Sequence, residues 1–330
     1  MLPIIAIATG DPAGIGPELS LKTARDPRVR ELCRPLLVGD PDVVARQAKA
    51  CGIDTGIRVV DAIGALDGTA DGVSLLAARA PDAARIEFGA NSAASGRASL
   101  AAASRAIKAA LVGEVDAVVA APQNQTSIAL AGIEFDGYPS FVARETGLAQ
   151  HDVYLMLCFG ETKIVHCTLH VSVREALAMI TRERVGHVLA TADRTLKRLG
   201  VAEPLIHLGG LNPHAGEGGL FGREEIEIIT PAIEAAKAQG IRVAGPFGAD
   251  TMFHKKGVGA FIVMLHDQGH ITAKLLARNA TAGLAIGSPI LFSSVAHGSG
   301  HDIVGKGVAD PTAMIEAVTR LAKAQPVRAA

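Results

Sequence analysis

The chain has 330 residues, 49% hydrophobic and 20% charged, which is too long for one ordinary core and predicts two domains or one large α/β unit. The net charge of -1, the absence of tryptophan and only two tyrosines argue against a nucleic acid or an anionic membrane surface as partner. The four cysteines form no CxxC pair, which argues against thiolate-bound zinc or a disulfide framework and favours reduced, mostly buried thiols in a cytoplasmic protein.

The chain begins with an apolar segment, residues 1–9, whose lack of a basic flank predicts a first β-strand rather than a signal peptide. No apolar run reaches the ~20 residues of a membrane span. Short β-branched or leucine-rich runs then alternate with longer helical patterns, which predicts a mainly parallel sheet covered by helices. The predicted strands are Ile4–Ala8, Pro35–Val38, Arg58–Val60, Ala117–Ala121, Val153–Cys158, Lys163–Leu169, Leu205–Leu208, Ala260–Leu265 and Pro289–Leu291. The predicted helices are Pro17–Ala24, Pro41–Ala50, Ala77–Ala84, Ala93–Ala110 with Arg97–Val112, Ser140–Thr146, Arg184–Leu199, Glu224–Gln239 and Thr312–Ala324.

The first predicted strand runs into GDPAGIGPE at residues 10–18. Its glycines let the backbone turn sharply and approach a ligand, and Pro17 suits the first turn of a helix. The segment is not a dinucleotide fingerprint, because Leu19 stands where the third glycine is needed, and no Gly-Lys-Ser/Thr makes it a Walker loop. Taken by itself, it is best interpreted as a plain strand-to-helix turn.

A denser glycine-rich segment, GGLNPHAGEGG at residues 209–219, follows the predicted strand Leu205–Leu208. So many glycines around one histidine suggest a backbone folded tightly about a bound group, with His214 at its centre. A flexible loop with an exposed His214 is the alternative, and the stiff Asn-Pro-His sequence argues against it.

Two further histidines end an alternating segment, in which His166 and His170 share one face of the predicted strand. His170, at the end of the strand, is the better candidate for a ligand. His166, further inside, is expected to be a hydrogen-bonded core histidine or a partner behind the ligands.

Residues 264–274 carry the densest set of ionisable groups, directly after a predicted buried strand: His266, Asp267, His270 and Lys274. Such groups at a strand's end lie at the ligand-binding edge of an α/β protein. An imidazole can hold a divalent metal and an ammonium can meet an anionic substrate, whereas the alternative is a solvated helix start. With no HxH or HExxH present, a metal site made by distant histidines at strand ends is a hypothesis.

Together these segments resemble the PdxA family, the 4-hydroxythreonine-4-phosphate dehydrogenases and their relatives, over nearly the whole chain. The segments that carry the resemblance are GDPAGIGPE at 10–18, APxN at 121–124, GLNPHAGEGG at 210–219, GPFGADT at 245–251, HDQGH at 266–270 with Lys274, and HGSGHDIVGKG at 297–307.

The resemblance implies a two-domain α/β/α fold like that of isopropylmalate and isocitrate dehydrogenases, with the active-site cleft between the domains at a homodimer interface. We predict a cofactor-side domain of residues 1–128 plus 275–330, and a second domain, 129–274, with the metal histidines and the dimer interface. The resemblance assigns a divalent metal shared between subunits to His170, His214 and His266, and substrate binding to Lys274. It also implies NAD, for which the candidate residues are Gly10, Asp11, Gly14, Asn212, His297 and Asp302.

Departures from the family pattern concern the substrate. The family's Gly-His-Thr-Glu, whose histidine and threonine touch substrate, is here Gly-Tyr-Pro-Ser at 137–140, and the lysine after APxN is Gln125. The family's substrate-binding asparagine and arginine align with Gly283 and Phe292, and no arginine occurs between residues 279 and 296. Burying a phosphate dianion without a guanidinium partner would cost on the order of several kcal/mol, so we infer a non-phosphorylated substrate.

One branch of the family, the terephthalate dihydrodiol dehydrogenases, resembles this chain at 137–140, 265–274 and 293–298. Its members oxidise 1,2-dihydroxy-3,5-cyclohexadiene-1,4-dicarboxylate to protocatechuate and carbon dioxide. A flat ring dicarboxylate suits a pocket in which the substrate-binding residues Tyr138, Pro139 and Phe292 replace phosphate donors.

The implied chemistry is oxidation of a hydroxyl beta to a carboxylate, followed by loss of carbon dioxide and rearomatisation. We assign Lys274 to neutralise a carboxylate or to shuttle a proton, and Asp267 to orient His266 or to transfer a proton. His270 is assigned either to the second substrate carboxylate or to the surface.

Two other functions are kept as alternatives. One is the parent activity on 4-hydroxythreonine phosphate or another four-carbon phosphorylated acid, and the missing arginine argues against it. The other is a non-catalytic metal- or ligand-binding protein, against which the retained histidines and Lys274 argue. An all-imidazole ligand set favours zinc, or another transition metal such as manganese, iron or cobalt, over magnesium. The sequence does not separate NAD from NADP.

Overall fold

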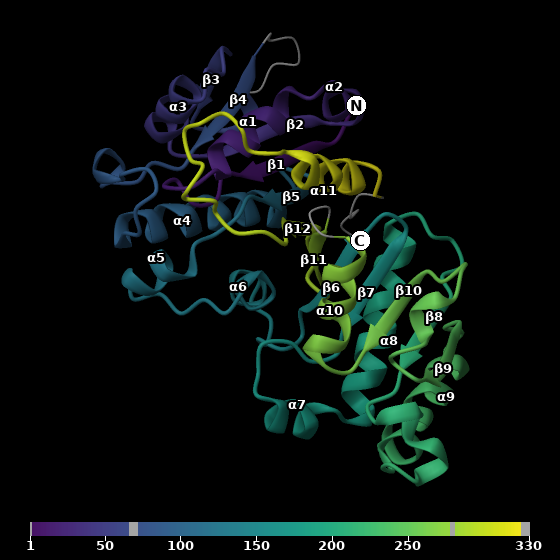
Figure 1. Cartoon of the computed structure of the whole chain (residues 1–330). Helices are drawn as coiled ribbons and strands as arrows, with labels where there is room; N and C mark the ends of the chain where they lie inside the picture. Colours follow the sequence, from purple (N-terminus) through teal and green to yellow (C-terminus); the bar gives the residue numbers. More distant parts are fainter. Residues whose placement is uncertain (1, 66–71, 278–280, 325–330) are drawn as a thin grey trace. The chain divides into compact units, whose positions relative to one another are not determined.

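The computed structural model describes residues 2–65, 72–277 and 281–324 (Figure 1). The chain divides into two compact units. The first unit is Met1–Gln150 with Ser288–Ala330, and the second unit is His151–Gly287.

Both unit boundaries lie further along the chain than the predicted positions after residues 128 and 274. Helix α6 (Tyr138–Glu145) packs against α4 (Ala93–Leu111), which keeps this segment in the first unit. Strand β11 (Ala282–Ile286) pairs with β6 (Tyr154–Phe159), which keeps that segment in the second unit.

The described part of the first unit contains a parallel sheet with the strand order β3–β4–β2–β1–β5–β12. Strands β1 and β5 are buried almost throughout, as expected for parallel strands covered on both faces. The strands are β1 (Ile4–Ala8), β2 (Arg34–Gly39), β3 (Ile57–Val60), β4 (Val73–Ala77), β5 (Ala117–Ala120) and β12 (Phe292–Val295).

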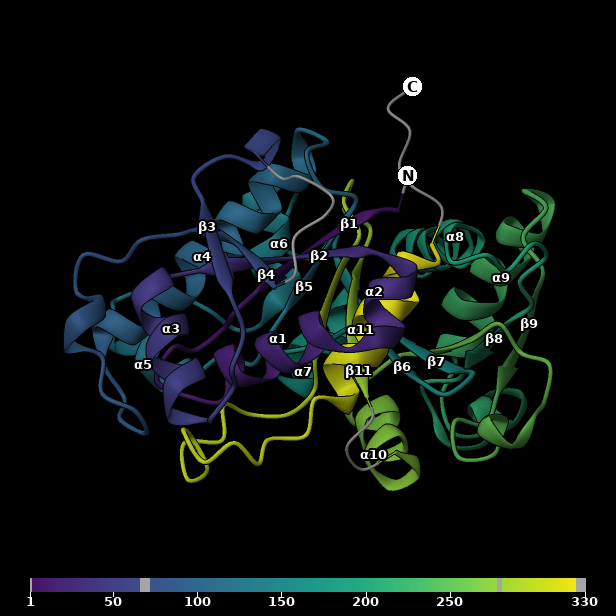
Figure 2. The same cartoon turned by 90° about the horizontal axis from the view of Figure 1, so that it is seen from above.

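Helices of the first unit form two groups on its sheet. Helices α1, α2 and α11 contact one another, and α4 contacts α5 and α6 (Figures 1 and 2). The remaining helices are α1 (Gly16–Arg25), α2 (Pro27–Leu32), α3 (Pro41–Ala50), α5 (Gln125–Leu130) and α11 (Thr312–Ala322), with short 3₁₀ turns at Ile63–Ala65 and Ala83–Arg85.

The second unit contains a mixed sheet with the order β11–β6–β7–β10–β8–β9. Strands β11, β6 and β7 pair antiparallel, and β7, β10, β8 and β9 pair parallel. The remaining strands are β7 (Thr162–His166), β8 (Ile206–Gly209), β9 (Val243–Phe247) and β10 (Ala260–Val263).

In the second unit, α8 contacts α9 and packs on β10 and β11, whereas α10 packs on β7 and β10. The helices are α7 (Val173–Met179), α8 (Arg182–Arg198), α9 (Thr230–Ala238) and α10 (His266–Leu276). A π-helical turn, Glu225–Ile229, opens α9, and a 3₁₀ turn spans Met252–His254.

Most predicted strands and helices are present, and the wrong predictions have local causes. The segment Ala77–Ala84 is not a helix: Ala77 ends strand β4, and Pro81 cannot continue a helix from the residues before it. The segment Pro289–Leu291 is not a strand but the turn between β11 and β12. Strands β4, β9, β11 and β12 and helices α2, α5, α7 and α10 were not predicted.

Across the described residues, no helix combines the length and apolar character needed to cross a membrane. All four cysteines are free thiols, in agreement with the prediction from their spacing. Burial raises the pKa of Cys33 to about 12 and that of Cys167 to about 11, so both remain protonated and unreactive at neutral pH.

Candidate active site

The predicted metal histidines follow three neighbouring parallel strands of the second unit. His170 comes after β7, His266 after β10 and His214 after β8, and β10 lies between the other two. Since the carboxyl ends of parallel strands lie at one edge of a sheet, all three segments begin at the same edge. The hydrogen bonds from Cys167 to Val263 and from Thr168 to Met264 carry the β7–β10 pairing beyond the strands.

The structure brings two of these three histidines together. The imidazole centroids of His170 and His266 are 5.5 Å apart. Among the described residues, no group of three or more His, Cys, Asp or Glu side chains is arranged to hold a metal ion, so His214 does not join them within one chain.

The contact between His266 and Asp267 suits a metal ligand. Its Nδ1 atom lies 2.7 Å from a carboxylate oxygen of Asp267, which is 80% exposed. A carboxylate that accepts the Nδ1 proton leaves the lone pair on Nε2, which is the arrangement found behind many metal-binding histidines. The imidazole nitrogens at this edge of the sheet therefore fit a borderline metal such as zinc better than magnesium, which prefers oxygen ligands.

Gln268 attaches the start of α10 to the loop that holds His214. Its side-chain carbonyl accepts hydrogen bonds from the backbone N–H groups of Met264 and Leu265, both 3.0 Å long. Its amide nitrogen donates to the Gly210 carbonyl at 3.1 Å. Sequence reasoning missed this residue, although a glutamine three residues after a helix N-cap is a known capping signal.

His270 is not a surface histidine. Its ring stacks on that of His266, with centroids 3.8 Å apart and the planes inclined by 8°. Its Nδ1 atom lies 3.1 Å from Nε2 of His166. Burial, together with the charge of neighbouring His266, lowers the pKa of His270 to about 4, so the ring is neutral at physiological pH.

His166 is buried behind this pair, in agreement with the prediction of a hydrogen-bonded core histidine. Its Nδ1 atom lies 3.3 Å from the Leu155 carbonyl oxygen, and burial lowers its pKa to about 3. Gly269 makes the room, because a Cβ atom there would overlap the His166 ring. The Gly269-His270 pair thus lets α10 pack directly on a buried imidazole.

Lys274 lies one helical turn beyond His270, so His266, His270 and Lys274 occupy one side of α10. Its side chain is exposed, and it makes no hydrogen bond or ion pair with any described residue. An unpaired ammonium beside these imidazoles is available to an anionic ligand.

His214 lies in a left-handed turn. The φ angles of His214, Ala215 and Glu217 are 51°, 52° and 42°, and the glycines between and after them are also positive. Each non-glycine residue in this region costs roughly 1–2 kcal/mol, so other contacts must stabilise the turn. The turn exposes His214, whose ring centroid is 6.1 Å from that of Phe221.

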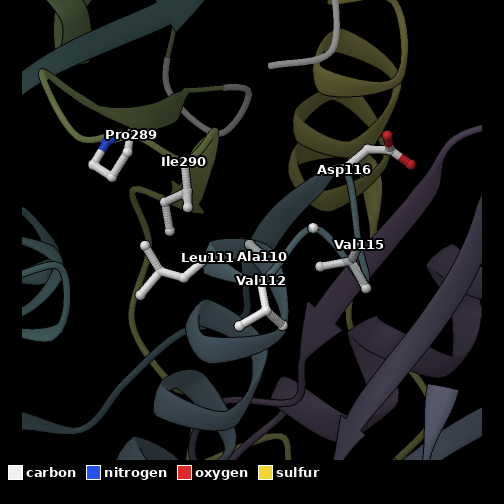
Figure 3. A pocket seen from close by; sticks show the side chains of 8 residues that line it. Ala110, Leu111, Val112, Val115, Asp116, Pro289 and Ile290 are labelled. Carbon is white, nitrogen blue, oxygen red and sulfur yellow. The ribbon is translucent and has the colours of Figure 1, made fainter. Parts of the chain in front are cut away.

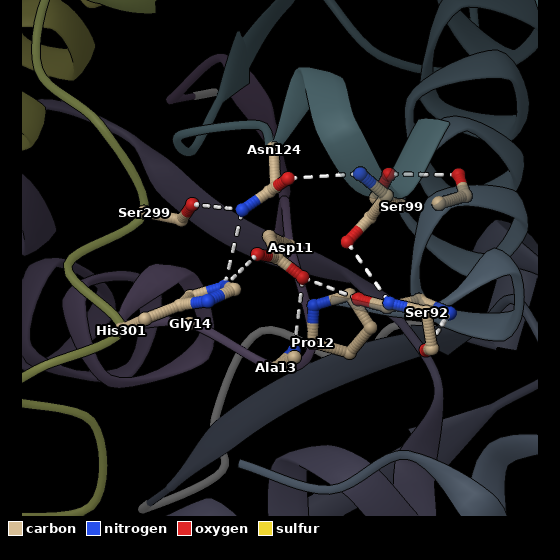
Figure 4. Close-up of polar contacts among 12 residues, drawn as sticks. Asp11, Pro12, Ala13, Gly14, Ser92, Ser99, Asn124, Ser299 and His301 are labelled. Carbon is tan, nitrogen blue, oxygen red and sulfur yellow. Dashed lines mark hydrogen bonds and ion pairs between the residues drawn. The ribbon is translucent and has the colours of Figure 1, made fainter. Parts of the chain in front are cut away.

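Asp11, a predicted cofactor residue of the first unit, lies in a hydrogen-bonded network (Figure 4). Asp11 is buried and accepts hydrogen bonds from the Ala13 backbone, the Ser95 hydroxyl and His301 Nε2, the last at 2.7 Å. Asn124 donates to the Ser299 hydroxyl. Asp11 thus ties the loop after β1 to the 297–307 segment, and His301 was not predicted for this role.

The remaining cofactor candidates have a range of surroundings. Gly14 donates a hydrogen bond to the Asp11 carbonyl and accepts one from Gln47, which is a structural role. His297 is partly exposed and Asp302 is exposed, so both are accessible to a ligand. Asn212 donates its side-chain amide to Glu224 and Glu225, which leaves its carbonyl oxygen for other partners.

The predicted substrate residues of the first unit form an aromatic cluster. The rings of Tyr138 and Phe292 lie 4.9 Å apart, and the Tyr138 hydroxyl accepts a hydrogen bond from Gln123 at 2.6 Å. Phe292 is 1% exposed and Pro139 is also buried. Within one chain, Phe292 and Pro139 therefore support Tyr138 from below rather than offering surface of their own.

A separate pocket of about 360 Å³ lies between the end of α4 and residues 289–290 (Figure 3). Its walls are mostly apolar, and its carboxylate, Asp116, accepts a hydrogen bond from the Ile4 backbone. It contains none of the predicted site residues, and its lining offers no group for acid–base chemistry beyond Asp116.

Known proteins resemble the chain over almost its full length. The family model described as pyridoxal phosphate biosynthetic protein PdxA matches residues 31–321. A Comamonas 1,2-dihydroxy-3,5-cyclohexadiene-1,4-dicarboxylate dehydrogenase is 39% identical over 98% of this chain and 98% of that protein. A provisionally named D-threonate 4-phosphate dehydrogenase from Symbiobacterium thermophilum is also 39% identical, over 96% of this chain and 95% of its own length.

Solved structures agree with this grouping. A 4-hydroxythreonine-4-phosphate dehydrogenase from Klebsiella pneumoniae has a TM-score of 0.86 at 32% identity, covering 98% of this chain and 99% of that one. A terephthalate 1,2-cis-dihydrodiol dehydrogenase from Burkholderia xenovorans has a TM-score of 0.72 at 38% identity, covering 99% of both chains. A beta-decarboxylating dehydrogenase from Thermococcus kodakarensis shares the fold alone, at 16% identity and a TM-score of 0.55 over 96% of this chain and 82% of that one.

The predicted α/β fold class is thereby confirmed, and the relatives that match along the whole chain are named as dehydrogenases. With a family model that spans most of the sequence, the chain belongs to the PdxA family.

Proposed function

We propose that this dehydrogenase catalyses the metal-dependent, NAD-linked oxidative decarboxylation of a non-phosphorylated cyclic dihydrodiol carboxylate. Our choice of substrate is 1,2-dihydroxy-3,5-cyclohexadiene-1,4-dicarboxylate, which would be converted to protocatechuate and carbon dioxide with reduction of NAD⁺ to NADH. The observation that carries this choice is the contact between Tyr138 and Phe292, the position that the family resemblance aligns with a substrate-binding arginine. The 39% identity to the Comamonas enzyme that is named for this substrate supports it.

A neutral aromatic pair is a poor partner for a phosphate. A dianion needs several charged or N–H donors, and neither ring supplies a cation. Burial raises the pKa of Tyr138, so its hydroxyl stays neutral, and that hydroxyl already accepts a hydrogen bond from Gln123. A flat ring can pack against Tyr138, with Phe292 behind it, at little electrostatic cost.

His170 and His266 of one chain, with His214, are the residues that would hold the divalent metal. When bound, the metal lowers the pKa of a substrate hydroxyl, and NAD accepts the hydride. Asp267 would hold the Nδ1 proton of His266 and keep its Nε2 lone pair directed outward. Neutral His270 would keep positive charge away from His266 and support its ring by stacking.

Lys274 would neutralise a carboxylate of the substrate. Its exposed ammonium on the same side of α10 as the histidines supports this role. Lys274 can pair with the carboxylate that leaves as carbon dioxide or with the second ring carboxylate. In the first case, His270 is the candidate partner of the second carboxylate.

A homodimer with shared metal sites accounts for the position of His214. This histidine does not join His170 and His266 within the described part of one chain, so a second copy would supply it. Leu220 and Phe221, directly after the His214 turn, are 73% and 49% exposed, and Ile226 is also exposed. Apolar side chains exposed beside a functional histidine support a subunit contact there.

Oxidation of a four-carbon phosphorylated acid is the second candidate. The Symbiobacterium relative named for D-threonate 4-phosphate matches at the same 39% identity as the dihydrodiol enzyme, which supports this alternative. The aromatic Tyr138–Phe292 pair is the observation that ranks it second.

NADH formation measured with each substrate separates the candidates. The purified enzyme is supplied with NAD⁺ and Zn²⁺ or Mn²⁺ and either the dihydrodiol dicarboxylate, 4-hydroxythreonine phosphate or D-threonate phosphate. We expect turnover on the dihydrodiol, with release of carbon dioxide, and its loss in His214→Ala at unchanged circular dichroism. Turnover on a phosphate ester alone would overturn the proposal, and turnover on none would favour a binding protein.

A further inference from the structure

The glycine-rich loop that contains His214 folds around a carboxylate of its own chain. Glu225 is 3% exposed, and one of its carboxylate oxygens accepts hydrogen bonds from the backbone N–H groups of Leu211 and Asn212, at 2.7 and 2.8 Å. Its other oxygen accepts one from the Asn212 side-chain amide at 2.9 Å. The tightly folded backbone predicted at residues 209–219 is thus explained by an internal group.

The glycines of this segment surround the Glu225 carboxylate at close range. A Cβ atom on Gly216 would lie 2.7 Å from one Glu225 oxygen, and one on Gly210 would lie 3.0 Å from the other. A Cβ on Gly222 would overlap the Asn212 amide. Gly210 and Gly216 therefore leave room for the buried Glu225 carboxylate, and Gly222 leaves room for the Asn212 amide that binds it.

The hydrogen bonds of the Glu225 carboxylate directly adjoin the left-handed turn that contains His214. The turn begins two residues after Asn212, and its first hydrogen bond runs from Ala215 N–H to the Asn212 carbonyl. Glu225 sits at the start of a π-helical turn, a feature that often marks a functional position. Strained backbone at His214 persists only where its surroundings determine it fully, and Glu225 fixes the entry to the turn through three hydrogen bonds to Leu211 and Asn212.

We propose that Glu225 is a positioning residue for His214: it holds the strained turn so that the imidazole is presented to the metal in a fixed orientation. This inference rests on the proposed function, in which His214 is a metal ligand. Glu225 itself does not touch the metal or the substrate, because both of its oxygens are occupied by loop donors.

Glu225→Gln tests this proposal with little change in side-chain volume. The glutamine carbonyl can still accept from Leu211 and Asn212, but its amide places two donors against the Asn212 amide. Glu227→Gln is the matched control, because Glu227 lies two residues further on, is 57% exposed and forms an ion pair with exposed Arg223. Asn212→Ala removes one of the three hydrogen bonds and provides a graded variant in case Glu225→Gln fails to fold.

The readout is the affinity of the metal-free full-length protein for Zn²⁺ alone, with neither NAD nor substrate present. We expect His214→Ala and Glu225→Gln each to weaken Zn²⁺ binding about 10- to 100-fold, Asn212→Ala to weaken it less, and Glu227→Gln to leave it unchanged. Because Glu225 acts through His214, the double variant His214→Ala/Glu225→Gln should bind Zn²⁺ as tightly as His214→Ala alone, within about twofold. Amide hydrogen exchange should rise at residues 211–219 in Glu225→Gln.

The outcomes distinguish this inference from the proposed function. If His214→Ala binds Zn²⁺ as tightly as the wild type, the metal role of His214 fails, and this inference fails with it. If His214→Ala loses affinity while Glu225→Gln does not, only the inference is overturned. A double variant whose losses add in full would also overturn it, since Glu225 would then act independently of His214.

Discussion

At the scale of single residues, the HDQGH segment gives each side chain a separate task. His266 is the proposed metal ligand, Asp267 contacts its Nδ1 atom, and Gln268 joins the helix start to Gly210. Gly269 leaves space for buried His166, and His270 fills the position between His166 and His266. The segment therefore combines a proposed ligand with the contacts that orient it, within little more than one helical turn.

A buried histidine away from this site provides a residue-scale prediction about pH. His207 lies between Phe247 and Phe261, and burial, with the charge of Lys255, lowers its pKa. The unfolded chain takes up a proton at His207 below about pH 6.5 while the folded chain does not, so stability falls as the pH decreases from there. We expect His207→Phe to reduce this acid-induced loss by up to about 1.4 kcal/mol per pH unit.

Urea unfolding of this variant and the wild type between pH 7.5 and about 5 measures the effect. His254→Phe serves as the control, because His254 is exposed on a nearby 3₁₀ turn. A pH dependence for His207→Phe that matches the wild type would show that His207 is not protonated differently in the two states.

At the scale of elements, helix caps hold segments together as well as starting helices. The carboxylate of Asp40 accepts hydrogen bonds from the Asp42 and Val43 N–H groups at the start of α3. Its second oxygen accepts one from Ala80, just after strand β4. One buried side chain therefore fixes both the start of α3 and the exit of the neighbouring strand.

Asp40→Ala is expected to lower the free energy of unfolding of the first unit by about 2–3 kcal/mol, because it removes the cap and leaves the partly buried Ala80 N–H without its partner. Asp26→Ala is the comparison, since Asp26 caps the short helix α2 with an exposed partner, Arg28, and should cost no more than about 1 kcal/mol. Urea denaturation followed by circular dichroism compares the two, and equal losses would mean that the Ala80 contact contributes little.

At the scale of the whole molecule, the separation of His214 from the His170–His266 pair predicts a site that needs two chains. A heterodimer of His214→Ala and His266→Ala chains, purified through two different tags, should then keep one of its two sites. A heterodimer of a wild-type chain with a chain that carries both His214→Ala and His266→Ala should keep neither site, because each of its sites lacks one histidine.

Metal content and NADH formation of the two heterodimers measure this directly. We expect about half of the wild-type metal in the first heterodimer and close to none in the second. The reverse order, with metal retained only by the wild-type and double-variant pair, would mean that each site is built within one chain.

Local sequence patterns determined most of the strands of this protein and the sheet edge at which its candidate site lies. Alternating apolar runs predicted the parallel strands, and three strands with histidines just beyond them predicted a site at one sheet edge, because side-chain period and strand direction are local properties. The helix predicted at Ala77–Ala84 failed because alanine has no preference strong enough to outweigh Pro81 and the pairing of β4 with β2.

Only the tertiary structure decided what surrounds those residues. That His270 stacks on His266, that Phe292 lies beneath Tyr138 and that Glu225 holds the loop around His214 all depend on packing between segments distant along the chain. A sequence shows which groups are charged, polar or aromatic, but burial and partner distance set their pKa values and orientations, and both arise only when the chain is folded.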